Sequence, residues 1–189
     1  MQKCKVGVTK NMVLADFSDI IKSEGKMDNL IIESAKAEDY ESILELYNEL
    51  HEVLEECNPQ RFRKLEKDEN ILTKEDFEKS LNHETYKTLD VCRIDGEVAG
   101  FIDYAIFDAY KFIGYNPCTI CFLGNIYIKK EFRRQGIGTR FIEYLKNEVC
   151  PKYNATRIEL EMEAKNLPAL SFYEKIGMSK ARIKFGLDV

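Results

Sequence analysis

The sequence has little of several things that mark specialised chains. Among 189 residues there are 4 Pro, 10 Gly, 2 His and no Trp. So little Pro and Gly argues against a fibrous or disordered chain. No second pair of Cys or His at zinc-ligand spacing accompanies Cys118 and Cys121, so we expect no metal. The chain also lacks the ~20 consecutive apolar residues of a membrane span, and its amino terminus lacks a secretory signal. We therefore expect a cytoplasmic protein with no membrane partner.

An excess of basic charge is missing as well. Lys and Arg number 28 and Asp and Glu 33, which gives a net charge of −5. This balance argues against nucleic acid as the main partner and favours a cationic or small neutral one. Hydrophobic residues make up 44% of the chain, enough for the core of a single domain.

Hydrophobic periodicity predicts alternating strands and helices from residue 29 onward. Residues 1–28 carry no motif, so we treat them as an amino-terminal extension of unknown role before a domain at 29–189. Apolar residues at helical spacing predict a long helix from Tyr40 to Leu54, and Asp95-Gly96 predicts a hairpin turn. Strands are expected at 30–33, 88–94, 98–107, 119–128, 158–163 and within 178–189, and further helices at 74–81, after 139 and at 167–176.

A glycine turn stands where an apolar strand leads into an amphipathic helix. It reads Arg133-Arg134-Gln135-Gly136-Ile137-Gly138-Thr139. Two glycines leave backbone N–H groups free at a helix start, where the helix dipole and two arginines attract a phosphate. The alternative is a tight connection without a ligand. The turn lacks the Gly-Lys-Ser/Thr of a nucleotide-binding P-loop and the third glycine of the dinucleotide fingerprint.

The chain at this point resembles the GCN5-related N-acetyltransferase (GNAT) family. The family's acetyl-CoA motif is matched by Arg133, Gly136 and Gly138. A second family signature is matched by the run from Asn166 to Met178, which reads Asn-Leu-Pro-Ala-Leu-Ser-Phe-Tyr-Glu-Lys-Ile-Gly-Met, with Met178 in place of Phe. The resemblance covers residues 30–189.

The resemblance implies an α/β fold whose mixed, mostly antiparallel sheet is splayed between strands 4 and 5, with helices on both faces. It implies acetyl-CoA as co-substrate and direct attack of an amine on the thioester. Tyr173 would be the acid that protonates the departing thiolate, and Asn166 would lie near the coenzyme. Pantetheine would lie along Ile126-Tyr127-Ile128, with the N–H of Ile128 on the thioester oxygen. The phosphates would lie on the turn formed by Arg133, Arg134, Gln135, Gly136, Ile137, Gly138 and Thr139.

The base is less clearly marked than the acid. By resemblance to protein N-terminal acetyltransferases of the family, Glu161 is the expected base. Glu159, Glu161 and Glu163 alternate on one face of the expected strand, where like charges would raise a carboxyl pKa. The alternative is that all three are solvated surface residues. Many relatives carry an acid on the fourth strand, where this chain has Gly124 and Asn125, so Glu163 or a water relay stays open.

The acceptor is expected to be a small cationic amine, because glutamates cover the first long helix. His51 on that helix is more simply a structural residue than an acceptor contact. The alternatives are a protein N-terminal or lysine acetyltransferase, or a silent acyl-CoA-binding module. A homodimer is compatible with the sequence.

Overall fold

The central feature of the fold is one five-stranded sheet with the strand order β1-β2-β3-β4-β5. The protein is described by a computed structural model, which places residues 29–82 and 84–187; the amino-terminal extension lies outside the described residues. The strands are β1 (Leu30–Ser34), β2 (Thr88–Ile94), β3 (Glu97–Ala109), β4 (Cys118–Ile128) and β5 (Arg157–Leu160). The helices are α1 (Tyr40–Cys57), α2 (Lys74–Leu81), α3 (Ile137–Tyr144), α4 (Cys150–Lys152) and α5 (Leu167–Lys175).

The pairing of the strands confirms a mixed, mostly antiparallel sheet. β1 to β4 pair antiparallel in sequence order, and β5 pairs parallel to β4. The turn between β2 and β3 has positive φ at both Asp95 (51°) and Gly96 (86°), as a two-residue hairpin requires. β4 carries one extra residue opposite Asp103 and Tyr104, because Asp103 pairs with Asn125 and Tyr104 with Leu123. Gly124 is therefore a bulge in β4.

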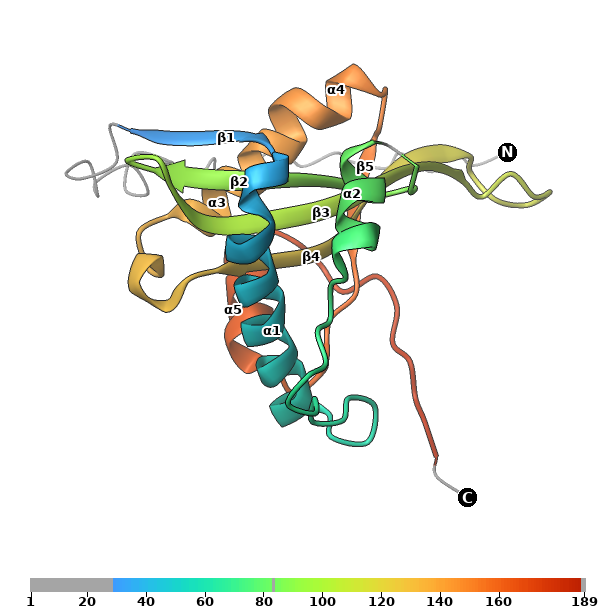
Figure 1. The fold of residues 1–189 in the computed structure, drawn as a ribbon. Coiled ribbons are helices and arrows are strands. Elements are labelled where there is room, and N and C mark those ends of the chain that lie inside the picture. Colours follow the sequence, from blue (N-terminus) through green and yellow to red (C-terminus); the bar gives the residue numbers. More distant parts are fainter. Residues whose placement is uncertain (1–28, 83, 188–189) are drawn as a thin grey trace, which may run out of the picture.

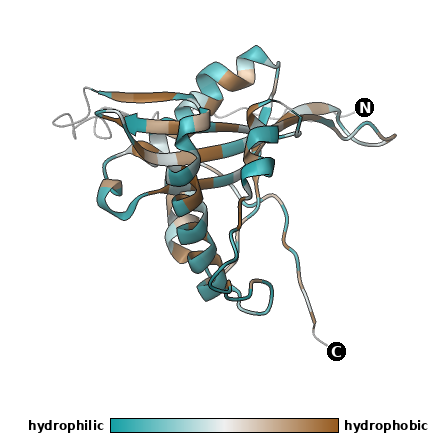
Figure 2. Cartoon of the chain, in the orientation of Figure 1, coloured by the Kyte–Doolittle hydropathy of each residue, from teal (hydrophilic) through white to brown (hydrophobic). Residues whose placement is uncertain are grey.

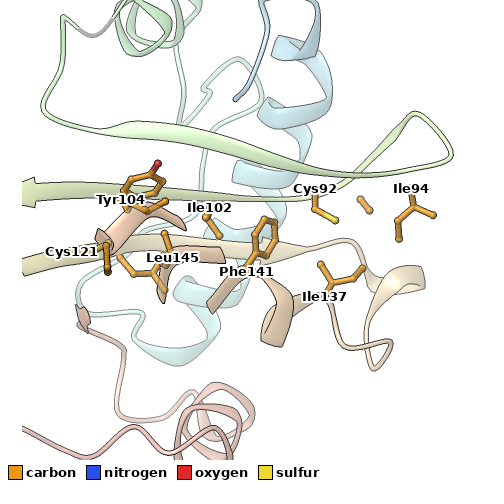
Figure 3. Close-up of a cluster of buried hydrophobic side chains, with 12 residues drawn as sticks. Cys92, Ile94, Ile102, Tyr104, Cys121, Ile137, Phe141 and Leu145 are labelled. Atoms are coloured by element: carbon orange, nitrogen blue, oxygen red, sulfur yellow. The ribbon is translucent and has the colours of Figure 1, made fainter. Parts of the chain in front are cut away.

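Helices cover both faces of the sheet (Figure 1). α1 and α2 lie on one face, where Ile43, Leu46 and Phe77 pack on Val91 and Phe101. α3 lies on the other face and continues through a π-helical segment (Leu145–Val149) into α4. Figure 3 shows Ile137, Phe141 and Leu145 of this helix against Cys92, Ile102 and Cys121 of the sheet. Hydrophobic residues accordingly gather along the strands in Figure 2.

The carboxy-terminal strand expected within 178–189 is wrong for the described residues 178–187, which form no strand. Their side chains alternate as a strand would, but Ile183, Phe185 and Leu187 are 73%, 89% and 88% exposed. Strand propensity takes effect only against a partner, and this segment leaves the sheet as an extended trace (Figure 1). β5 is also shorter than expected, because it ends at Leu160 and not at Glu163.

No helix among the described residues is long and apolar enough to cross a membrane. No group of three or more His, Cys, Asp or Glu among them could hold a metal ion.

Candidate active site

The site lies where β4 and β5 separate. The two strands pair only from Ile120 opposite Arg157 to Leu123 opposite Leu160. β4 continues five residues further, so in the described structure its edge toward β5 is unpaired at 124–128. Lys129 N–H donates to the carbonyl of Ala99 on β3, 2.9 Å away. Because successive N–H groups of a strand point to opposite edges, the N–H of Ile128 points into the gap.

The glycine turn opens from the end of this strand. Gly136 is the N-cap of α3 and has φ 87°, in the left-handed region that favours glycine, and Arg134 has φ 64°. No side chain caps the helix at Gly136. The first-turn N–H groups at Ile137, Gly138 and Thr139 are those that a helix leaves without intrahelical partners. Arg133 and Arg134 are exposed beside them. These residues fit a pyrophosphate group.

Arg133 also links the turn to the sheet and to α1. Its Nε donates to the carbonyl of Ile128 at 2.9 Å, and its guanidinium lies 4.9 Å from the ring centre of Tyr127. The Tyr127 hydroxyl in turn donates to Glu49 on α1 at 2.9 Å. Burial, together with this glutamate, raises the pKa of Tyr127 to about 12. Gln135 donates to the carbonyl of Glu131 at 3.0 Å, which closes the turn on its outer side.

Gly138 brings the turn into contact with α5. A Cβ at position 138 would lie 3.0 Å from Cζ of Phe172 and 3.6 Å from Cδ1 of Ile128. A side chain at this position would crowd the Phe172 ring, so glycine allows α3, α5 and the end of β4 to come this close.

Tyr173 follows Phe172 on α5 and is 9% exposed. Burial raises the pKa of its phenol to about 12. Asn166 begins the helix as the sequence predicted, because its side-chain oxygen accepts from the N–H of Ala169 at 3.2 Å. Gly177 ends it with φ 88°. The structure thus places a buried phenol on the helix that packs against the glycine turn.

The expected face of three glutamates is wrong, because β5 ends before Glu161. Glu159 is the only one within the strand, and it bonds Arg157 and Tyr110. Glu163 accepts from Asn58 at 2.8 Å and from Arg61 at 2.8 Å, both just beyond α1. Glu161 is exposed one residue after β5. The three carboxylates therefore have separate environments.

A buried carboxylate beside the site was not predicted from the sequence. Asp103 on β3 is 1% exposed and faces α1. Its Oδ2 accepts from the Tyr47 hydroxyl at 2.6 Å and from Nδ2 of Asn125 at 2.5 Å. The signal was present, since Asp103 interrupts an apolar run in a central strand, where a charge is costly unless it is partnered.

The acidic face of α1 forms an open hollow next to the end of β4. Its lining comprises Glu41, Leu44, Glu45, Asn48, Glu49, Glu52 and Lys130. His51 is not part of it. His51 is 9% exposed, and its Nε2 lies 2.8 Å from the carbonyl oxygen of Arg63. The histidine therefore anchors the segment after α1.

The model of the acetyltransferase (GNAT) family matches residues 40–178. The chain belongs to this family.

Two relatives in sequence are named as N-acetyltransferases. An N-alpha-acetyltransferase of Saccharolobus solfataricus is 31% identical over 98 residues, which cover 51% of this chain and 59% of that protein. A [ribosomal protein bS18]-alanine N-acetyltransferase of Escherichia coli is 36% identical over 62 residues, which cover 33% and 41%. This chain thus matches less than two thirds of the length of either relative.

The GNAT fold is confirmed by solved structures. The BH1408 protein of Bacillus halodurans, solved as a mutant, superposes with a TM-score of 0.76 over 84% of this chain and 99% of that one, at 20% identity. At this identity the likeness concerns the fold alone.

Proposed function

We propose that the protein is an acetyl-CoA-dependent N-acetyltransferase that acts on a primary amine by direct attack in a ternary complex. The observation that carries the proposal is the contact of three elements at Gly138. There the glycine turn of α3 meets the free end of β4 and the helix that bears Tyr173. The turn offers free N–H groups for a phosphate, the end of β4 offers a backbone N–H that β3 does not use, and the helix in contact with both bears a buried phenol. These are the parts that acyl transfer from a thioester needs.

The coenzyme site is assigned to the chain's own groups. The N–H groups after Gly136, with Arg133 and Arg134, bind the pyrophosphate, and Gln135 and Thr139 complete the turn. The backbone of Ile126, Tyr127 and Ile128 binds pantetheine, and Asn166 lies near the coenzyme at the start of α5. Acetyl-CoA supplies the acetyl thioester. The N–H of Ile128 polarises its carbonyl oxygen, because it points into the gap and is not used by β3.

Tyr173 is the proposed acid. A phenol whose pKa is raised to about 12 stays protonated at neutral pH, and it can donate to a thiolate as the carbon–sulfur bond breaks. Glu161 is the base that the family resemblance predicts, and its exposed position after β5 leaves it free of the ion pairs that hold Glu159 and Glu163.

The acceptor is proposed to be a small cationic amine. The hollow on α1 offers four glutamates and one lysine, and this charge attracts a polyamine or an aminoglycoside. A protein amino terminus is the second candidate, and the names of the two relatives in sequence favour it.

The release of free coenzyme A in the presence of each acceptor distinguishes a small cationic amine from a protein amino terminus. We expect kcat/KM for spermidine to exceed that for a peptide that begins with alanine. Glu45→Gln combined with Glu52→Gln should raise KM for spermidine and leave the peptide unaffected. The reverse preference would assign the chain to protein N termini. Acetyl-CoA binding without turnover of any amine would contradict the enzyme and favour a silent acyl-CoA-binding module.

A further inference from the structure

Tyr127 on β4 lies between the glycine turn and the acidic hollow on α1. Its side chain is 6% exposed and belongs to the core between the sheet and α1. The hydroxyl reaches Glu49, which lines the hollow. The face of the ring lies against the guanidinium of Arg133, which belongs to the turn. One buried side chain therefore contacts a residue of each proposed binding site.

The hydroxyl end of Tyr127 holds a carboxylate of the hollow. It donates to Oε2 of Glu49 at 2.9 Å. Burial and this hydrogen bond raise the pKa of Tyr127 to about 12, so the hydroxyl keeps its proton at neutral pH and remains a donor. The bond uses one carboxylate oxygen of a half-buried side chain, so Glu49 keeps acceptor capacity toward the hollow.

This bond distinguishes Glu49 from the other glutamates of the hollow, which are Glu41, Glu45 and Glu52. Among these four, within the described residues, only Glu49 accepts a hydrogen bond from another side chain. A free glutamate loses rotamer entropy when it binds a cation, whereas a glutamate that is already held loses less. Glu49 is therefore the carboxylate of the hollow that is best prepared to bind an ammonium group.

The ring of Tyr127 holds an arginine of the turn. The Arg133 guanidinium lies 4.9 Å from the ring centre, and its Nε donates to the carbonyl of Ile128 at 2.9 Å. These contacts use the flat face of the guanidinium and one of its N–H groups, so the terminal N–H groups remain for a phosphate. The ring thus holds Arg133 beside the free N–H groups of the turn.

We propose that Tyr127 is a positioning residue with two separable roles. Its hydroxyl orients Glu49 toward the ammonium group of the acceptor, and its ring orients Arg133 toward the pyrophosphate of the coenzyme. The proposal rests on the proposed acetyltransferase function and on the placement of the acceptor in the hollow. Since the side chain acts through the two residues that it holds, a substitution removes one role and keeps the other.

The test compares Tyr127→Phe with Tyr127→Leu in the full chain, with spermidine as acceptor. Tyr127→Phe removes the hydroxyl and keeps the ring, so KM for spermidine should rise by about 3- to 10-fold while Kd for acetyl-CoA stays unchanged. Tyr127→Leu removes both, so Kd for acetyl-CoA should rise as well, by about two- to fivefold. Rates of coenzyme A release and calorimetric titration measure the two constants.

Tyr153 provides a matched control. Its ring lies 5.1 Å from the Lys152 ammonium, so it has the same kind of contact with a cation, and it lies just after α4 and outside both proposed sites. Tyr153→Phe and Tyr153→Leu should leave KM for spermidine and Kd for acetyl-CoA at the wild-type values. Changes as large as those at position 127 would overturn the proposal.

A double-mutant cycle tests whether the hydroxyl acts through Glu49. Glu49→Gln removes the charge that binds the ammonium group, so it should raise KM for spermidine. Tyr127→Phe added to Glu49→Gln should raise KM little further, because the residue that the hydroxyl holds is already impaired. Additive effects on KM would overturn the role of the hydroxyl.

Two further results would overturn the proposal. One is an unchanged KM for spermidine in Tyr127→Phe. The other is a Kd for acetyl-CoA that rises as much in Tyr127→Phe as in Tyr127→Leu, which is the pattern of a general loss of packing. If Tyr127→Leu does not fold, Tyr127→Phe and the cycle decide. Either result in a chain whose wild type acetylates spermidine contradicts Tyr127 alone, whereas a wild type that turns over no amine contradicts the proposed function, and Tyr127 with it.

Discussion

Gly138 on α3 and Phe172 on α5 are in such close contact that a Cβ on the glycine would lie 3.0 Å from the phenylalanine ring. This contact sets the distance between the glycine turn and the helix that carries Tyr173. It therefore joins the proposed coenzyme site to the helix of the proposed acid.

Substitution of Gly138 should move the glycine turn and the helix that carries Tyr173 apart. Gly138→Val forces Phe172 away from α3, so we expect a loss of about 1–3 kcal/mol in the free energy of unfolding and a higher Kd for acetyl-CoA. Thermal unfolding and calorimetric titration measure both. Gly186→Val is the control, since nothing lies within 4 Å of a Cβ at position 186. Equal stability and affinity in the two variants would show that the contact does not shape the site.

The glycine turn can be tested at Gly136 by separating backbone strain from charge. Gly136 has φ 87°, which asparagine tolerates better than most residues. Gly136→Asn should therefore retain most of the affinity for acetyl-CoA, whereas Gly136→Glu should abolish binding, because its carboxylate competes with the phosphates. Circular dichroism verifies that both variants fold. If Gly136→Glu binds acetyl-CoA as well as Gly136→Asn, the pyrophosphate does not lie at this turn.

Asp90 on β2 is buried, and the hydroxyls of Tyr104 and Tyr144 both donate to its Oδ2. This cluster predicts an effect on stability without an effect on function. The Tyr144 hydroxyl donates to Oδ2 of Asp90 at 2.9 Å, and burial raises the pKa of Tyr144, so the hydroxyl remains a donor. Tyr144→Phe should lower the free energy of unfolding by about 1–3 kcal/mol, since it removes a donor from a buried carboxyl oxygen. Tyr153→Phe, at a site 42% exposed, should change it by less than about 0.5 kcal/mol. Denaturant titration compares them, and equal effects would contradict the role given to Asp90.

Features of the fold that depend on interactions between neighbouring residues were predicted correctly from the sequence. Positive φ at Asp95-Gly96, the cap at Asn166 and the glycine turn each depend on a few neighbouring residues, and all three are confirmed. Features that depend on distant partners were harder to predict. The alternation within 178–187 predicted a strand, but a strand also needs an edge to pair with.

The environment of Asp103 could not be predicted from the sequence, because its partners lie far from it along the chain. Its partner Tyr47 lies 56 residues away on α1, and the room for its carboxylate depends on Gly124 in the next strand. In the sequence, Gly124 and Asn125 stand where many relatives carry an acidic residue on the fourth strand. In the folded chain these two residues lie against the carboxylate of Asp103 on β3.

The most direct test of the central claim is the rate of coenzyme A release from acetyl-CoA, with and without amine, in the wild type and in Tyr173→Phe. The wild type should release coenzyme A only with an amine, and Tyr173→Phe should lower kcat by about 10²- to 10⁴-fold while it binds acetyl-CoA normally. Because burial raises the pKa of Tyr173 to about 12, the acid stays protonated, and wild-type kcat should not fall between about pH 8 and about pH 10. Undiminished release by Tyr173→Phe would contradict the assignment of the acid, and binding without release in the wild type would contradict the enzyme.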